Sequence, residues 1–357
     1  MSGRRFYTAA NLVLLCTLSS PVFAAENAED KREIQQVLRK IQASAQKMNY
    51  SGTFVYQQAS QIRTSRITHY LDSAGETEKL EILDGKPREY IRRNDEVSCY
   101  LPDSKTIQVE KDVNQESFPA LLTQNAQYLP DFYTIRKGEM SRVAGLECQT
   151  YSLEPKDGFR YGYRLCAEKS SGLMLRAQTV NPKNEVIEQI AFTQLQVNDI
   201  DKNKLKPSFP HVSQWRIENL TVQSNIHSGW VVKALPAGFT KTKELKRVIP
   251  SPASPASSTS TNNASNAGNA GSASANAAAN KTAKSHQVIQ MMFSDGLAAM
   301  SVFIEPYSEG RTEGSLQQGA MTIMGKRQGE YWLTVVGEVP VSAIRQVMNS
   351  IELKTNK

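Results

Sequence analysis

Short runs that alternate apolar and polar residues fill most of the chain, and this period of two is typical of β-strands. Turn signals separate many of the runs, among them residues 72–75 (Asp-Ser-Ala-Gly) and 84–87 (Asp-Gly-Lys-Pro). Such regularly spaced short strands predict a large, meandering antiparallel sheet. Its expected strands are 53–57, 66–71, 79–83, 89–93, 98–101, 106–110, 132–136, 142–143, 147–153, 159–166, 174–180 and 186–197.

Three segments show a helical period instead: 26–48, 115–127 and 341–351. The first two are available to cover the large sheet. In the third, the apolar residues form one face, which suits packing on a second, smaller antiparallel sheet. The strands expected in that sheet are 238–248, 287–293, 297–304, 321–324 and 331–336. The pattern as a whole predicts a mainly β (α+β) fold.

Composition divides the chain further. Residues 201–226 are polar and contain prolines, so we interpret them as a linker between a first domain (25–200) and a second domain (227–357). Residues 251–285 consist mainly of Ser, Ala, Asn, Thr and Gly and lack aromatic residues. Such a segment cannot offset the entropy of ordering, and strand-like sequence flanks it on both sides. We therefore expect a disordered insert within the second domain.

The N-terminus has the pattern of a secretory signal peptide. Arg4 and Arg5 precede an apolar stretch at 6–18, and small residues follow up to Ala24. This order predicts cleavage after Ala24, which leaves 1–24 as the signal peptide and exports the rest. An uncleaved membrane anchor is the alternative. Cys16 follows two leucines rather than the small residue of a lipidation signal, so we expect a soluble mature protein.

The excess of basic over acidic residues lies in the C-terminal part of the chain. Residues 25–224 contain 27 basic and 27 acidic residues, whereas residues 225–357 contain 13 basic and 8 acidic residues. An excess of positive charge favours an acidic protein partner or an anionic lipid surface. The alternative is that it serves solubility alone. Nucleic acid is not expected as a partner of an exported chain that has no recognition motif.

Three cysteines remain after cleavage: Cys99, Cys148 and Cys166. A turn at 155–158 is expected to join the strands that carry Cys148 and Cys166. A hairpin centred on Asp157 would place these two cysteines directly opposite each other, as a candidate disulfide. The alternative is two buried free thiols, because a slip of one residue moves one of them to the other face.

No catalytic constellation is present in the sequence. The four histidines, His69, His211, His227 and His286, are far apart, and no C-x-x-C, G-x-S-x-G or phosphate-binding glycine loop occurs. We therefore expect neither an enzyme nor a cofactor or metal site. An unrecognised hydrolase is kept as a minor alternative.

Binding is the remaining class of function. A curved sheet that is only partly covered would have an apolar concave face, and its aromatic and aliphatic residues are candidates to line a lipid cavity. The alternative is that they form ordinary core. The candidate lining residues are Phe54, Tyr56, Tyr70, Leu80, Ile82, Tyr90, Tyr161, Tyr163 and Phe192. Basic residues on the same strands that could meet an anionic headgroup are Arg63, Arg66, Arg88, Arg92 and Arg93.

Several stretches resemble the RseB/MucB family of periplasmic regulators of the envelope-stress sigma factor. Three lie in the first domain: 49–56 (NYSGTFVY), 83–89 (LDGKPRE) and 157–163 (DGFRYGY). Four lie in the second domain: Trp230, 235–239 (LPAGF), 294–296 (SDG) and 337–340 (GEVP). The similarity runs in order from about residue 31 to residue 351, and the insert at 251–285 departs from it.

The resemblance implies a large domain similar to the LolA/LolB lipoprotein carriers, an incomplete β-barrel with helices across its opening. It also implies a periplasmic protein that binds the periplasmic region of a membrane-spanning anti-sigma factor and shields it from site-one proteolysis. Lipopolysaccharide or lipid would release that partner. We take Trp230, Phe239 and Arg327 as candidate partner contacts. A periplasmic lipid or lipoprotein carrier is the alternative function, and the existence of a homo-oligomer stays open.

Overall fold

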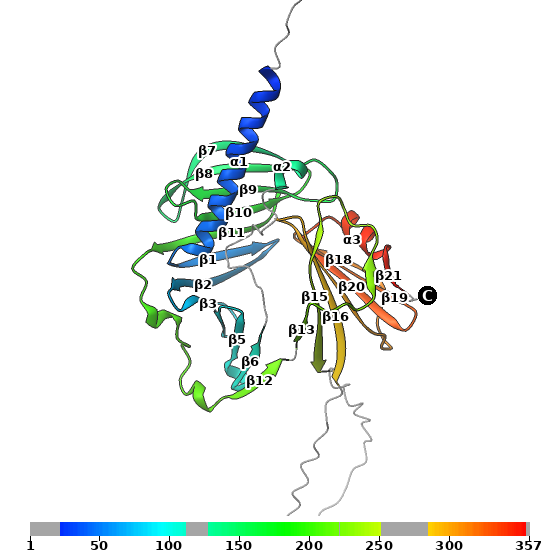
Figure 1. Ribbon diagram of the computed structural model, residues 1–357. Helices are drawn as coiled ribbons and strands as arrows, with labels where there is room; N and C mark the ends of the chain where they lie inside the picture. The colour runs from blue at the N-terminus through cyan, green and yellow to red at the C-terminus, as the bar shows by residue number, and fades with distance from the viewer. Residues whose placement is uncertain (1–21, 112–127, 221, 251–284, 355–357) are drawn as a thin grey trace, which may run out of the picture.

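The computed structural model describes residues 22–111, 128–220, 222–250 and 285–354. Two open β-sheets lie side by side in it, a large one built from residues 50–220 and a small one built from residues 222–337 (Figure 1). The expected helix 115–127, nearly all of the insert 251–285 and most of the signal peptide with Cys16 lie outside the described residues.

The large sheet has twelve strands in the order β12-β6-β5-β4-β3-β2-β1-β11-β10-β9-β8-β7. All neighbours are antiparallel except β12, which runs parallel to β6. β12 and β7 are the two ends of the sheet, so it is open, as expected for an incomplete barrel. The strands are β1 (Tyr50–Gln58), β2 (Gln61–Asp72), β3 (Gly75–Ile82), β4 (Arg88–Arg93), β5 (Glu96–Leu101), β6 (Thr106–Glu110), β7 (Tyr133–Val143), β8 (Leu146–Pro155), β9 (Gly162–Glu168), β10 (Met174–Val180), β11 (Val186–Val197) and β12 (Arg216–Leu220).

Helix α1 (Val22–Lys47) packs across β8, β9 and β10, with its first residues inside the expected signal peptide. Leu38 and Ile41, one turn apart, are both buried against Leu165 and Ala167 of β9. The short helix α2 (Leu129–Phe132) closes the same cluster through Leu129. One amphipathic helix therefore covers part of the large sheet.

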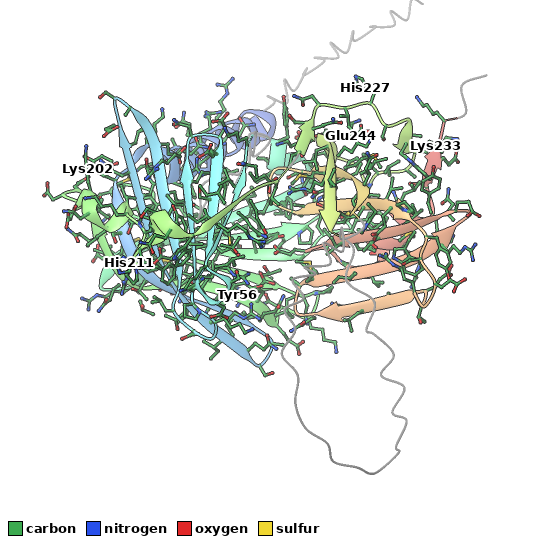
Figure 2. All side chains as sticks on the ribbon, turned by 90° about the horizontal axis from the view of Figure 1, so that it is seen from below. Tyr56, Lys202, His211, His227, Lys233 and Glu244 are labelled. Atoms are coloured by element: carbon green, nitrogen blue, oxygen red, sulfur yellow. A yellow bond between two sulfur atoms is a disulfide. The ribbon has the colours of Figure 1, made fainter. Side chains whose placement is uncertain are left out.

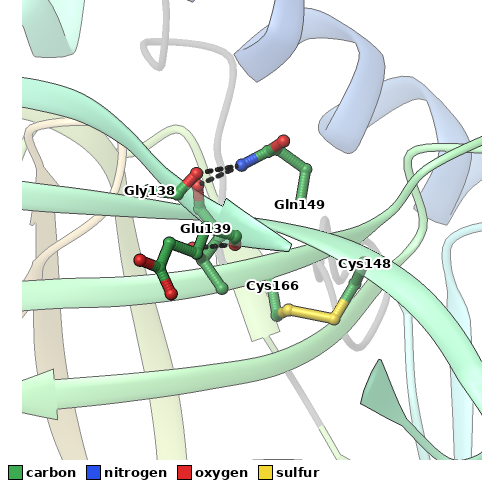
Figure 3. Close-up of a disulfide and its surroundings, with 6 residues drawn as sticks. Gly138, Glu139, Cys148, Gln149 and Cys166 are labelled. Atoms are coloured by element: carbon green, nitrogen blue, oxygen red, sulfur yellow. Dashed lines mark hydrogen bonds between the residues drawn. A yellow bond between two sulfur atoms is a disulfide. The ribbon is translucent and has the colours of Figure 1, made fainter. Parts of the chain in front are cut away.

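A disulfide joins Cys148 of β8 to Cys166 of β9 on the face away from α1, with 5.4 Å between the two Cα atoms (Figure 3). The cysteines are not directly opposite each other, because Cys148 pairs with Glu168 and Cys166 pairs with Thr150. The hairpin thus centres on Gly158 rather than on Asp157 as we expected. This shift moves the pairing by two residues, which keeps both side chains on one face.

The small sheet has seven strands in the order β13-β15-β16-β17-β20-β19-β18. Helix α3 (Val341–Met348) packs on one face through Ile344 and Val347, both fully buried. A separate pair of strands, β14 (Trp230–Val232) and β21 (Ile351–Leu353), flanks this core. The strands of the sheet are β13 (Val222–Ser224), β15 (Thr240–Pro250), β16 (Ser285–Ser294), β17 (Ala299–Pro306), β18 (Gly314–Gln318), β19 (Met321–Gln328) and β20 (Tyr331–Gly337).

The segment between the sheets runs over the face of the large sheet that α1 does not cover. It contains two short 3₁₀ helices, η3 (Lys202–Leu205) and η4 (Val212–Gln214). The buried ammonium of Lys79 holds it down by donating to the carbonyl of Lys206 and the hydroxyl of Ser208, at 2.8 and 2.6 Å. The expected linker 201–226 is therefore attached to the large sheet, and it also contains β12 of the large sheet and β13 of the small sheet.

Candidate functional site: the joint between the two sheets

Arg160 lies at the centre of one contact between the two sheets, on the turn that joins β8 to β9. Its side chain is fully buried, and its Nε donates to Asp295 Oδ2 at 2.6 Å, from the turn between β16 and β17. The guanidinium also donates to Asp157 and to the carbonyl of Ala237. The hydroxyl of Tyr133 donates to the same oxygen of Asp295 at 3.2 Å. We call this group the Arg160 contact.

Aromatic rings enclose the same guanidinium. The rings of Phe132 and Phe239 each lie 4.9 Å from its central carbon, one from each half of the chain. Gly238, with a φ of +85°, brings its backbone so close to Phe132 that an added Cβ would overlap the ring. A buried cation that is paired, hydrogen-bonded and sandwiched between π faces is well compensated for the loss of water.

Each sheet also places an apolar side chain in the core of the other. Phe159, next to Arg160, packs against the core of the small sheet. Leu297, two residues after Asp295, is buried in the cluster beneath α1. Ser342 at the start of α3 donates to the carbonyl of Gly158 at 2.7 Å. Both cores are thus completed at this joint.

A second contact, which we call the carboxylate contact, consists of Tyr56, Gln58, Glu188, Ala320 and Glu338. Glu188 of β11 accepts a hydrogen bond from the side chain of Gln58 at 3.4 Å and another from the backbone of Ala320 in the small sheet. Burial raises the pKa of Glu188. Burial and, secondly, the charge of Glu188 raise the pKa of Glu338 to about 7. The charges of these two carboxyl groups therefore repel each other across the joint.

The same edge of the joint contains a cavity of about 230 Å³, lined by Tyr56, Gln58, Gln61, Arg63 and Gln318. Figure 2 shows Tyr56 where the large sheet approaches the small one. Gln317 of β18 donates to the hydroxyl of Tyr161 at 2.9 Å, so the end of this strand is attached to the large sheet.

A buried cluster of charges lies farther along the large sheet. His69 Nδ1 donates to the carbonyl of Met48 at 2.7 Å, and Nε2 lies 2.8 Å from Glu76 Oε1. Arg92 contacts Glu76 and Glu78, at 2.5 and 3.4 Å. Burial raises the pKa of Glu78 to about 7, against the opposing effect of Arg92. His69, Glu76 and Glu78 are close enough together for a metal ion, but the guanidinium already supplies the cation between the two carboxylates.

Most of the expected lining residues project from one face of the large sheet, the face on which α1 packs, but several of them are packed in separate buried clusters along it. Phe54 and Phe192 pack edge to face in a buried cluster with Leu80 beside it, and Tyr163 is buried in the cluster under α1. Tyr56 and Tyr161 lie at the joint. Tyr70 points to the opposite face, where the ammonium of Lys202 lies 4.7 Å from its ring. Ile82 and Tyr90 lie on β3 and β4, where Arg88 donates to the Tyr90 hydroxyl at 3.3 Å.

Two of the expected partner contacts lie inside the protein. Trp230 and Phe239 are each 5% exposed in the core of the small sheet, so they offer no surface to a partner in this structure. Arg327 is at the surface, with its guanidinium 4.0 Å from the ring centre of Tyr307. Sequence reasoning did not predict the roles of Arg160, Asp295, Glu188 and Glu338. The available signal was that the segments 157–163, 235–239, 294–296 and 337–340, on which the family resemblance rests, all meet at this joint.

Family models match both halves of the chain. The MucB/RseB N-terminal domain matches residues 33–209, and the MucB/RseB C-terminal domain matches residues 224–352. The chain belongs to the MucB/RseB family. Relatives include the sigma-E factor regulatory protein RseB of Haemophilus influenzae, 23% identical over 98% of both chains. The sigma factor AlgU regulatory protein MucB of Pseudomonas aeruginosa is 25% identical over 96% of this chain and 97% of that protein.

A solved structure of MucB in complex with MucA(peri) has the same architecture, with a TM-score of 0.63 and 25% identity. The match covers 90% of this chain and 100% of that one. This is a family of regulatory, protein-binding proteins. In the described part of the chain, no helix has both the length and the apolar character needed to cross a bilayer.

Proposed function

We propose that this chain is an exported regulator that binds the periplasmic region of a membrane-spanning anti-sigma factor and thereby shields it from site-one proteolysis. The observation that supports this most strongly is the match to the MucB chain of the MucB–MucA(peri) complex over both sheets and the joint between them. The signal-peptide pattern at 1–24 supports export to the periplasm. In this proposal the protein acts by binding and performs no catalysis.

The test uses the mature chain, residues 25–357, as bait for membrane proteins solubilised from its own cell. A single-pass anti-sigma factor should be recovered at low salt, and its purified periplasmic region should become resistant to the site-one protease when the chain is added. Failure to recover such a protein, or unchanged proteolysis in the presence of the chain, would contradict the proposal.

A matched pair of variants examines the role of the basic second half. Arg327→Glu reverses a charge on β19 in the small sheet, and Arg216→Glu reverses one on β12 at the end of the large sheet, where the side chain is 72% exposed. If the partner is acidic and binds the small sheet, the first variant should weaken binding about tenfold at low salt and the second should not. Equal effects would remove Arg327 from the interface.

We further propose that lipid releases the partner. The apolar side chains that could receive an acyl chain are packed under α1, with Leu38 and Ile41 each 2% exposed. Entry of lipid therefore requires α1 to move away from β9 and β10. Lipid can release the partner only if it binds the free and the complexed protein with different affinities. Native mass spectrometry should detect bound lipid, and hydrogen exchange should detect faster exchange in α1. A lipid-bound protein with unchanged α1 exchange would contradict this route.

A further inference from the structure

Each of the two sheets has two edge strands: β7 and β12 in the large sheet, and β13 and β18 in the small sheet. These four edge strands differ in how they are protected against pairing with a strand from another chain. β7 has an irregular register between Lys137 and Met140 and contains several charged residues. β12 carries two charged residues, Arg216 and Glu218. β13 has three residues. Charges, bulges and short length are the usual means by which proteins prevent association at a sheet edge.

β18 is different from these three. Its five residues, Gly-Ser-Leu-Gln-Gln at 314–318, carry no charge, and all of them are exposed. The register with β19 is regular from Gly314 to Gln318. Among the described residues, β19 is the one strand to which the backbone of β18 pairs. The backbone groups on its other side match the spacing of an extended peptide.

The side chains next to this edge are apolar. Leu316 of β18 is 66% exposed and lies directly opposite Ile323 of β19, which is 40% exposed. Both project from the sheet face opposite the one that α3 covers, since their neighbour Met324 packs into the α3 core. An added strand would place every second side chain beside Leu316. The edge therefore suits an uncharged segment with an apolar residue at that position.

The edge is also held in place. Gln317 donates to Tyr161 of the large sheet and to the carbonyl of Gly319, and Gly319 lies close to Gln58 of β1. A peptide paired with β18 would therefore run towards the carboxylate contact. A rigid edge loses little conformational entropy when a peptide binds to it.

We propose that β18 binds an extended, uncharged segment from the periplasmic region of the anti-sigma partner as an added strand. This inference rests on the proposed function. A second copy of this chain is a poorer occupant, because a stable interface buries about 1,200 Å² or more. A strand of five residues offers only part of that area. A partner that also binds elsewhere on the protein does not need all of it here.

The experiment measures hydrogen exchange of the amides at 314–318, free and in complex with the purified periplasmic region of the anti-sigma factor. Added-strand pairing should slow exchange of the outward amides at least tenfold. Leu316→Lys, which places a charge on the edge, should weaken binding about tenfold. Ile217→Lys is the control, because Ile217 is 61% exposed on β12, at the far end of the large sheet.

The outcomes separate this inference from the proposed function. A complex that forms while the amides at 314–318 exchange as in the free protein would overturn the inference and leave the function intact. Failure of the wild-type chain to bind the partner would overturn both. Slow exchange in the free protein that depends on its concentration, together with a doubled mass, would assign the edge to a second copy and also overturn the inference.

Discussion

The two contacts that join the sheets hold charge in opposite ways. At the Arg160 contact, a fully buried guanidinium meets two carboxylates, a carbonyl and two aromatic rings. At the carboxylate contact, Glu188 and Glu338 approach each other, and no ion pair to either is found among the described residues. The first contact contains its own counter-charges. The second depends on whether a proton is bound, so the joint has one permanent and one pH-dependent half.

The largest effect is expected from breaking the permanent half. Asp295→Ala removes the buried acceptor of Arg160 Nε and leaves a buried charge less compensated, which should lower the free energy of unfolding by about 3–5 kcal/mol. Urea unfolding measures it. Glu154→Ala is the control, because its pair with Arg136 is exposed on both sides and should contribute less than about 1 kcal/mol. Equal costs for the two variants would show that the Arg160 contact is not a stabilising one.

The disulfide lies away from the carboxylate contact. Removing it should lower the stability of the protein without changing the pH dependence that the carboxylate contact produces. Replacing Cys148 and Cys166 by serine opens a link across 18 residues and should cost about 3 kcal/mol. The pH dependence of unfolding should remain that of the wild type, because no residue of the carboxylate contact is changed. A changed pH profile would mean that the β8–β9 hairpin and the joint are coupled.

Glu338→Gln removes the titrating carboxyl group of the carboxylate contact and so tests the pH-dependent half of the joint. A raised pKa means that the folded protein holds the proton more tightly than the unfolded chain. Stability is therefore lost as pH rises from about 4.5 to about 7, the unfolded and folded pKa values of Glu338. The variant should be more stable than wild type at pH 8 by about 3 kcal/mol and equal to it at pH 4.5. Glu78, whose pKa is also about 7, titrates in both proteins, so the difference between them reports Glu338. A constant difference across this range would contradict the assignment.

The smallest effect concerns an ion pair that also crosses between the sheets, from Arg247 of β15 to Glu110 of β6 at 2.7 Å. Both side chains are partly exposed, so Glu110→Gln should cost about 1 kcal/mol or less. The cost should fall further in high salt, whereas that of Asp295→Ala should not. Unfolding at two salt concentrations compares them. A salt-independent cost for Glu110→Gln would place this pair with the buried contacts.

Local pattern was sufficient where a residue's neighbours in sequence decide its environment. The helix expected at 26–48 corresponds to α1, and most of the expected strands of both sheets are present. Boundaries were less accurate. The strands expected at 132–136 and 142–143 are one strand, β7, and the helix expected at 341–351 ends at Met348 before β21. The strand β18 was not predicted, because Gly-Ser-Leu-Gln-Gln has no strand-type alternation, and pairing with β19 alone makes it a strand.

The candidate site shows a sharper limit. Phe54 and Phe192 have the character of cavity residues in sequence, yet in the structure each fills space against the other. Trp230 and Phe239 belong to the segments of family resemblance, but they serve as core. Arg160 and Asp295 are separated by 135 residues, so no local pattern could pair them.

Residue types and their spacing were enough to predict most strands of the two sheets, the amphipathic faces of α1 and α3 and the basic excess of the C-terminal part. They also carried the resemblance to one protein family. These properties depend on side-chain type and on spacing along the chain. Only the tertiary structure decided which charges are buried together, which cysteine pairing register is used and which sheet edge stays open. Those outcomes depend on distances between residues far apart in sequence, where desolvation and pairing of charges act only after the two sheets have met.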